Sequence, residues 1–337
     1  MRIPREANGL GIGWLSVFLT LIVAASGSYN IANAQDFPSK PLTIVVPLAA
    51  GSGVDLIART YGDQLAKSLG RPVVVENRPG AATMLATASV ASAPPDVHTL
   101  LVATSSAMAI NPFLYKKIAY DPIRDLVPIA LYLKSPFVLV VHPDVPALSV
   151  GELVNHAKQR SSPLTFSSPG AGTAQHLAVE FMKQRFGVNM THVPYRSNPQ
   201  SISDVVAGHI NLSFIESAAA QPLIREGKVR GLAVSTVTRL QVLPELPTLA
   251  EASGTPDFEA VSWHALFAPA ATPDGIIERL HLEMKRIMST PEIRRLLLDR
   301  GQVPVDTPPV DGIKNYVQSE QKKWGALVKA LGLEGSQ

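Results

Sequence analysis

Short apolar runs recur along the chain, each ending in small polar residues and followed by a stretch with helical periodicity. Runs without polar alternation are typical of strands buried on both faces, as in a parallel sheet. Strands that alternate with helices predict an α/β fold. Five segments carry the pattern: LTIVVPLAAGSG from Leu42, TLLVATSSA from Thr99, PLTFSSPGAGT from Pro163, INLSFIESAA from Ile210 and GLAVSTVT from Gly231.

Capping residues mark the ends of several helices. Residues 149–152 read SVGE, a capping box in which the serine accepts from a backbone N–H and the glutamate reaches back to the capping residue. Residues 290–292 read TPE and predict a second helix start, with Gly301 just past that helix. Apolar residues in 54–69 recur at helical spacing, and Gly70 ends that helix.

The N-terminal residues have the pattern of a targeting segment. Arg2 and Arg5 precede an apolar run from Leu10 to Ala25, and 32–34 read ANA before Gln35. A run of about 16 residues is shorter than the ~20 that span a bilayer. The pattern favours export with cleavage after Ala34 over a transmembrane anchor, so residues 1–34 are predicted to be a signal peptide.

Composition and charge exclude several classes of protein. A chain of 337 residues favours two domains, and 46% hydrophobic with 17% charged residues is typical of a globular protein. The formal net charge is only +3, and basic residues cluster only in pairs without interleaved aromatics, which excludes a nucleic-acid surface. There is no cysteine, hence no disulfide framework. The eight histidines contain neither H-x-H nor H-E-x-x-H, so we expect no metal and no cofactor.

Two loops of small residues predict a site for anions. FSSPGAGTAQHL (166–177) and VPLAAGSGVD (46–55) each join a predicted strand to a helix. Small residues let a ligand approach the backbone, and a helix start supplies unpaired N–H groups. Gly172 is followed by Thr173 and not by lysine, so the first loop is no P-loop. Facing one another, the loops would suit a molecule with an acidic group at each end, such as a dicarboxylate. For either loop alone, simple chain reversal remains the alternative.

Five single residues have two interpretations each. His176 either donates to a carboxylate or packs beside the loop. Asp55, in the first turn of a helix, favours a structural role, since its charge would repel an acidic ligand. Glu216 is expected to cap a helix or to meet a cation. Arg196 is expected at the surface, with a role in ligand binding or lobe closure as the alternative. Trp263 is expected in the core, with an aromatic pocket wall as the alternative.

Eight segments, in order, resemble the substrate-binding proteins of tripartite tricarboxylate transporters, the Bug family. Together they cover nearly the whole chain after the leader. They are PSKPLTIVVPLAAGSGVDLIAR (38–59), RPVVVENRPGA (71–81), INPFLY (110–115), FSSPGAGTAQHLAVEFM (166–182), HVPYRS (192–197), REGKVRGLAVST (225–236), LPTLAEA (246–252) and LFAPAATP (266–273).

The resemblance implies an α/β protein of the type II periplasmic-binding-protein fold. Two α/β lobes would be joined by two crossing segments, with the ligand enclosed in a central cleft as in a Venus flytrap. Lobe one would comprise 35–136 and 260–337, and lobe two 137–259. The resemblance further implies a monomer in the periplasm, a small organic acid as ligand, no cofactor, and a small and a large integral membrane subunit as partners.

The resemblance also implies which residues hold the ligand, partly through backbone groups and waters. One end would be bound by 48–52 and the other by 167–173, while Tyr195 and 104–107 would close the sides. The candidate residues are Leu48, Ala49, Ala50, Gly51, Ser52, Thr104, Ser105, Ser168, Gly170, Ala171, Gly172, Thr173, His176 and Tyr195.

Three segments depart from the family's usual pattern. The chain reads VPLAAGS for VPFAAGG, ATSSAMAINP for GTSGTHAINP, and SFIE for MFDN, with Ile215 where aspartate is frequent. Loss of that aspartate disfavours an amino acid and favours a dicarboxylate with an apolar middle, aliphatic or aromatic. Two other functions stay open. One is a sensor subunit for a membrane kinase, and the other an exported hydrolase, because scattered Ser, His and Asp residues can assemble a triad.

Overall fold

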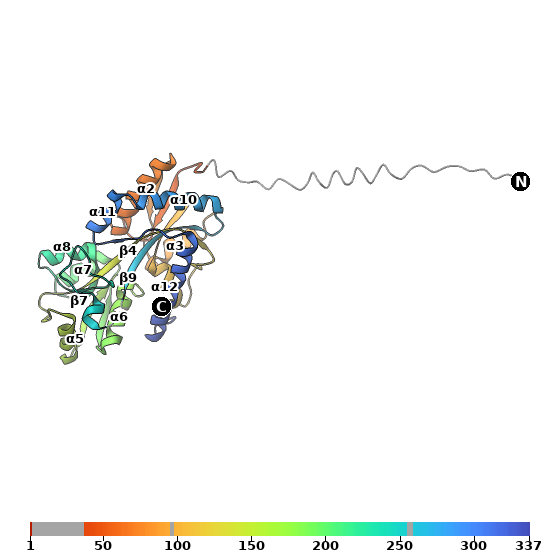
Figure 1. Cartoon of the computed structure of the whole chain (residues 1–337). Helices are drawn as coiled ribbons and strands as arrows, with labels where there is room; N and C mark the ends of the chain where they lie inside the picture. The colour runs from red at the N-terminus through yellow and green to blue at the C-terminus, as the bar shows by residue number, and fades with distance from the viewer. Residues whose placement is uncertain (2–36, 95–97, 255–258) are drawn as a thin grey trace. The chain divides into compact units, whose positions relative to one another are not determined.

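The computed structural model describes residues 1, 37–94, 98–254 and 259–337. The predicted leader lies outside the described residues, apart from Met1. Residues 38–337 form one structural unit, which is drawn with its helices and strands in Figure 1. Within the described residues, no helix is long and apolar enough to cross a membrane.

Strand β4 organises the ten-stranded sheet of this unit, because two groups of strands share it. The first half of β4 belongs to the first group, in which β2, β1, β3 and β9 follow one another and β10 also pairs with β4. The strands are β1 (Leu42–Val46), β2 (Val73–Asn77), β3 (Thr99–Thr104), β4 (Leu126–Val141), β5 (Leu164–Ser168), β6 (Met190–Pro194), β7 (Leu212–Glu216), β8 (Arg230–Val234), β9 (Val261–Pro269) and β10 (Val303–Pro304).

The second group begins at Phe137 of β4, which pairs antiparallel with β7 and β8. Strand β5 then pairs parallel with β6 and β7, as β1 does with β2 and β3 in the first group. The α/β class is confirmed, but the expectation of a parallel sheet is wrong for β4, β8 and β9, which are antiparallel to their partners. The partner exchange at Phe137 coincides with one boundary of the predicted lobes, whose exact residue bounds stay a prediction.

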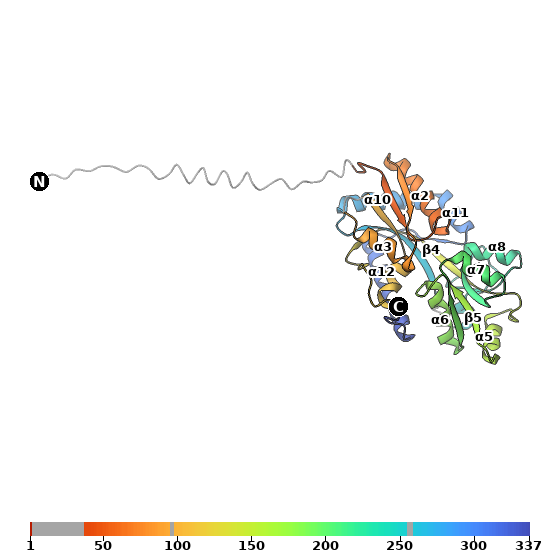
Figure 2. The ribbon, with the colours of Figure 1, turned by 180° about the vertical axis from the view of Figure 1, so that it is seen from behind.

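Helices cover both faces of each strand group (Figures 1 and 2). On β1, α2 packs against the face of Ile44, and α3 and α12 share a core with Val45, the next residue along the strand. The helices are α2 (Gly53–Leu69), α3 (Met84–Ala91), α4 (Asn111–Leu114), α5 (Val150–Gln159), α6 (Ala174–Phe186), α7 (Asn198–Val206), α8 (Ser217–Arg225), α9 (Leu249–Ser253), α10 (Asp274–Met288), α11 (Pro291–Asp299) and α12 (Val310–Ala330), with a 3-10 turn η2 (Ala81–Thr83) and a π-helix η3 (Ser106–Ile110).

One apolar core runs through both groups of strands. It extends from Trp324 of α12 and Trp263 of β9 to Phe166 of β5 and Leu177 of α6. A separate cluster on the opposite face of the second group includes Val138. The continuous core makes residues 38–337 a single unit although the strand pairing changes halfway along β4.

The predicted helix ends are confirmed, with one correction. Thr290 caps α11 and Gly70 ends α2 in a left-handed conformation. Ser149 caps α5 and accepts from Glu152 N–H at 3.1 Å. The Glu152 carboxylate, however, accepts from Leu148 N–H at 2.7 Å and not from the capping serine. The side chain is long enough to reach one residue further back.

Candidate ligand-binding site at two helix starts

The start of α2 is shaped by Asp55. Its carboxylate accepts from Gly51 N–H at 2.8 Å, from Asn77 Nδ2 at 2.9 Å and from Arg59 Nε at 3.1 Å. Burial acts to raise the pKa of Asp55, but these hydrogen bonds outweigh it and hold the pKa below its usual value. Asp55 therefore has the structural role that the sequence predicts: it folds the preceding loop back over the helix start.

The loop before α2 leaves part of its backbone accessible. Leu48 and Ser52 are half-buried, and 49–51 are exposed. Ser52 N–H donates to Ala49 O at 3.2 Å, so this amide is occupied. The N–H groups of Gly53 and Val54, in the first turn of α2, make no hydrogen bond within the described part of the chain. They are the unpaired donors that a helix start offers to an anion.

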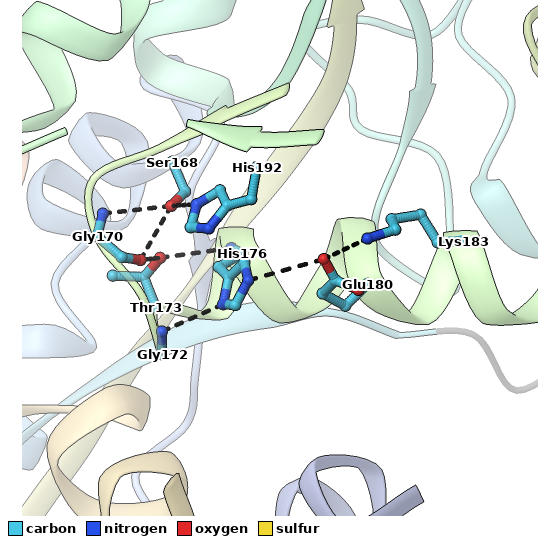
Figure 3. A network of polar contacts seen from close by, with 8 residues as sticks. All are labelled: Ser168, Gly170, Gly172, Thr173, His176, Glu180, Lys183 and His192. Atoms are coloured by element: carbon cyan, nitrogen blue, oxygen red, sulfur yellow. Dashed lines mark hydrogen bonds and ion pairs between the residues drawn. The ribbon is translucent and has the colours of Figure 1, made fainter. Parts of the chain in front are cut away.

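The start of α6 is braced by its own side chains (Figure 3). Gly170 N–H donates to Ser168 Oγ at 3.2 Å, and Thr173 Oγ1 donates to Gly170 O at 2.8 Å. Gly172 N–H donates to His176 Nδ1 at 3.2 Å. These predicted site residues lie together, but several of their polar groups hold the loop in shape.

Histidines 176 and 192 form a stacked pair behind this loop (Figure 3). Their ring centroids lie 4.0 Å apart, and Phe166 stacks on His192 at 4.8 Å. Desolvation by burial is the main cause that lowers the pKa of His176 to about 3 and that of His192 to about 4. A neutral His176 can accept from Gly172 N–H, so of its two predicted roles the geometry favours packing beside the loop.

Three backbone N–H groups are left unpaired in the second loop and the first turn of α6. The N–H groups of Ala171, Ala174 and Gln175 make no hydrogen bond among the residues that the structure describes. Ala174 and Gln175 form the first turn of α6, so they match Gly53 and Val54 of α2. Each strand group therefore contributes one helix start with at least two unpaired amides.

Both helix starts lie against the opposite strand group. A Cβ placed on Gly172 would overlap Leu114 Cδ2 and would lie 3.7 Å from Asn111 Oδ1, both on α4. A Cβ placed on Gly53 would lie 3.8 Å from Glu216 Oε2, at the end of β7. Glycine is needed at 172 for this close approach, and its φ of 76° also favours glycine.

Sequence reasoning missed two polar residues at this place. Asn111 Nδ2 donates to Ala82 O at 2.8 Å, while its Oδ1 is buried without a partner in the described residues, as is Thr83 Oγ1. Residues 81–83 all have positive φ, between 46° and 75°, although none is glycine. Asn111 lies in INPFLY, one of the segments that carry the family resemblance, so it could have been predicted as a site residue. No pattern in the sequence pointed to Thr83.

Thr104, Ser105 and Tyr195 differ in how their polar groups are used. Thr104 Oγ1 is buried without a partner among the described residues. Ser105 Oγ donates to Ser262 Oγ at 3.2 Å. Tyr195 N–H donates to Ser168 O at 2.9 Å, and its hydroxyl donates to Asp204. Tyr195 therefore lies beside the second loop, while Thr104 is the one of the three with a spare hydroxyl.

Other single-residue expectations are settled by the structure. Arg196 is exposed, and Trp263 is fully buried, with its indole N–H donating to Glu320 at 3.0 Å. The expectation for Glu216 is wrong. It occupies the position before α8, but its side chain makes no capping hydrogen bond and no ion pair within the described residues.

A cavity of about 320 Å³ lies away from these loops. It is formed mainly by α6 and α12, with Phe181 and Trp324 in its wall, and includes none of the predicted site residues. No group of three or more metal-binding side chains occurs in the described part of the chain.

Two strand groups on a shared β4, each presenting a helix start to the other, define a two-lobed solute-binding protein. Residues 57–333 match the family described as "Tripartite tricarboxylate transporter family receptor". The chain belongs to this family, which is one of solute receptors and not of enzymes. The family's members are periplasmic transporter receptors.

Relatives and solved structures agree with this assignment. The "UPF0065 protein in tcbD-tcbE intergenic region" of Pseudomonas sp. (strain P51) is 35% identical over 99% of this chain and 98% of its own. The structure "R. palustris Rpa4515 with adipate" is 31% identical with a TM-score of 0.82, over 88% of this chain and 99% of that one. "MatC (Rpa3494) from Rhodopseudomonas palustris with bound malate" is 30% identical with a TM-score of 0.78, over 87% and 100%.

Proposed function

We propose that this receptor captures a small dicarboxylate, aliphatic or aromatic, between its two strand groups and delivers it to a small and a large membrane subunit. The observation that carries the proposal is the pair of helix starts, one in each group, with unpaired N–H groups at Gly53 and Val54 and at Ala174 and Gln175. Each helix start favours one carboxylate. Residues 1–34 would direct export to the periplasm.

The buried acceptors at lobe one add to the proposed site. Asn111 Oδ1 and the hydroxyls of Thr83 and Thr104 lack partners within the described residues. Buried polar atoms without partners are costly, so hydrogen bonds to a ligand or to bridging water would recover that cost. The remaining predicted residues of 48–52 and 168–173 would form the backbone walls.

The strength of such a site is adequate without an arginine clamp. Two or three hydrogen bonds to a charged carboxylate contribute about 1.5–3 kcal/mol each. A micromolar dissociation constant requires about 8 kcal/mol, so two carboxylates leave a margin for the entropy lost on association. Solved relatives whose titles name adipate and malate support a carboxylate as the cargo.

A thermal-shift screen of residues 35–337 tests the proposal. The panel contains mono-, di- and tricarboxylates, including adipate and malate, together with amino acids as the matched comparison. A dicarboxylate at 100 times its dissociation constant should add about 2.7 kcal/mol to the free energy of unfolding and raise Tm. No shift with any carboxylate, or larger shifts with amino acids, would contradict the proposed ligand class.

A further inference from the structure

The carboxyl group of Glu216 lies near the place where the two strand groups meet, beside the start of α2. It follows β7 and precedes α8, and it makes no hydrogen bond or ion pair among the described residues. Its Oε2 lies 3.8 Å from the position that a Cβ of Gly53 would take, at the start of α2. The carboxyl of Glu216, in one strand group, therefore lies beside the first turn of α2 in the other.

No positively charged side chain of the described residues pairs with Glu216. On α2, Arg59 pairs with Asp55 at 2.9 Å, and on β4, Lys134 pairs with Glu259 at 3.0 Å. Glu216 is partly exposed, yet enough protein surrounds its carboxyl for burial to raise its pKa to about 7, and burial is the one cause of this shift. The group is therefore poised to change its protonation state near neutral pH.

A ligand carboxylate at the start of α2 would meet this group directly. Two ionised carboxylates at such a distance repel each other, and the usual result is that one of them keeps a proton. The proton would stay on Glu216, because the N–H groups of Gly53 and Val54 stabilise the charged form of the ligand. A protonated carboxyl is a hydrogen-bond donor, so the repulsion becomes an attraction.

We propose that Glu216 binds the cargo in its protonated form and donates a hydrogen bond to a ligand carboxylate, so that capture of the ligand is coupled to uptake of a proton. This inference rests on the proposed function, because it needs an acidic ligand. The proton comes from solvent and no bond of the ligand is broken. Glu216 would thereby act as a specificity residue that favours anionic ligands when the pH is low and releases them when it is high.

Calorimetry of residues 35–337 with adipate and with malate tests the coupling. Titrations at pH 8 in two buffers of different ionisation enthalpy should reveal uptake of about one proton for each ligand bound, and titrations at pH 6 close to none. The dissociation constant should vary little near pH 6, where Glu216 is already protonated and the ligand is still ionised, and should rise toward about tenfold per pH unit above pH 8.

Two variants separate Glu216 from other titrating groups. Glu216→Gln carries a permanent donor, so it should bind at pH 6 about as tightly as the wild type and keep that affinity at pH 9. Glu226→Gln, at the exposed far end of α8, should titrate as the wild type does. Without ligand, a raised pKa means that the contribution of Glu216 to stability is present below pH 4.5 and is lost as the pH passes 7, so Glu216→Gln should gain in Tm over the wild type between pH 5 and 8.

The outcomes distinguish this inference from the proposed function. Ligand binding without proton uptake, or an unchanged pH dependence in Glu216→Gln, would overturn the inference and leave a carboxylate receptor. Tighter binding of amine-bearing acids than of adipate or malate, lost in Glu216→Gln, would identify an ionised Glu216 and overturn it as well. Absence of binding by the whole carboxylate panel would contradict both.

Discussion

At the scale of single residues, Gly172 determines how closely the loop before α6 approaches α4. An added Cβ would overlap Leu114 Cδ2, so the leucine side chain would have to move, and the φ of 76° is itself unfavourable for alanine. We predict that Gly172→Ala weakens dicarboxylate binding by up to about tenfold, because the loop and α4 can approach each other less closely. Calorimetric titration measures this change.

A substitution at a second glycine distinguishes the effect of the contact with Leu114 from the effect of backbone strain. Gly187, which ends α6, has a φ of 61° and nothing within 4 Å of an added Cβ. Gly187→Ala should therefore lose stability, about 1 kcal/mol, without losing affinity. Adding Leu114→Ala to Gly172→Ala should restore part of the binding by making room. Equal losses of affinity in both single variants would show that the contact with Leu114 is irrelevant.

At the scale of elements, the histidine pair ties the stability of β5, β6 and α6 to pH. Burial lowers the pKa values of His176 and His192 from 6.5 to about 3 and about 4, so the native state favours the neutral rings. Their contribution to stability is present above pH 6.5 and is lost as the pH falls toward these values. We predict a loss of up to about 1.4 kcal/mol per pH unit for each histidine below pH 6.5.

Urea denaturation at pH 7 and at pH 4.5 measures this loss. A double variant, His176→Asn with His192→Asn, removes the titrating rings and should lose less stability over the same interval. His156, in the last turn of α5, provides a substitution outside the stack as control. If the double variant were as acid-sensitive as the wild type, carboxylates elsewhere would account for the acid response.

At the scale of the whole molecule, ligand capture should alter the distance between the strand groups. Gly172 lies close to α4, and Gly53 lies close to Glu216, on the proposed ligand side. We predict that saturating dicarboxylate reduces the radius of gyration in X-ray scattering, as expected for hinge closure. A monocarboxylate that does not bind serves as control. Superposable curves with and without ligand would argue against hinge closure.

The sequence predicted the strands that are followed by small polar residues. It did not predict β4 and β9, the two strands that connect the others into one sheet. β1, β3, β5 and β7 are each followed by small residues, which gives a local signal. Strands β4 and β9 are mostly apolar and lack such an end, so only the paired structure distinguishes them from buried helices. Local chemistry therefore predicted the elements, and the antiparallel connection required the tertiary fold.

The candidate site was likewise predictable only in part. The two loops could be predicted because small residues before a helix have a local meaning, and they do lie at the starts of α2 and α6. The approach of Glu216 to Gly53, and the unpaired oxygens of Asn111 and Thr83, depend on residues far apart in sequence. Such contacts leave no local pattern, so the expectation that Glu216 caps a helix or meets a cation was wrong for the described residues.

The shared strand β4 has a consequence for protein engineering. Pro136 pairs with β9 and Phe137, the next residue, pairs with β7, so no linker separates the two halves along β4. Neither half can be excised as a module without exposing a long row of unpaired amides and carbonyls. Chimeras between relatives should therefore exchange the loops at the helix starts and leave strand β4 intact.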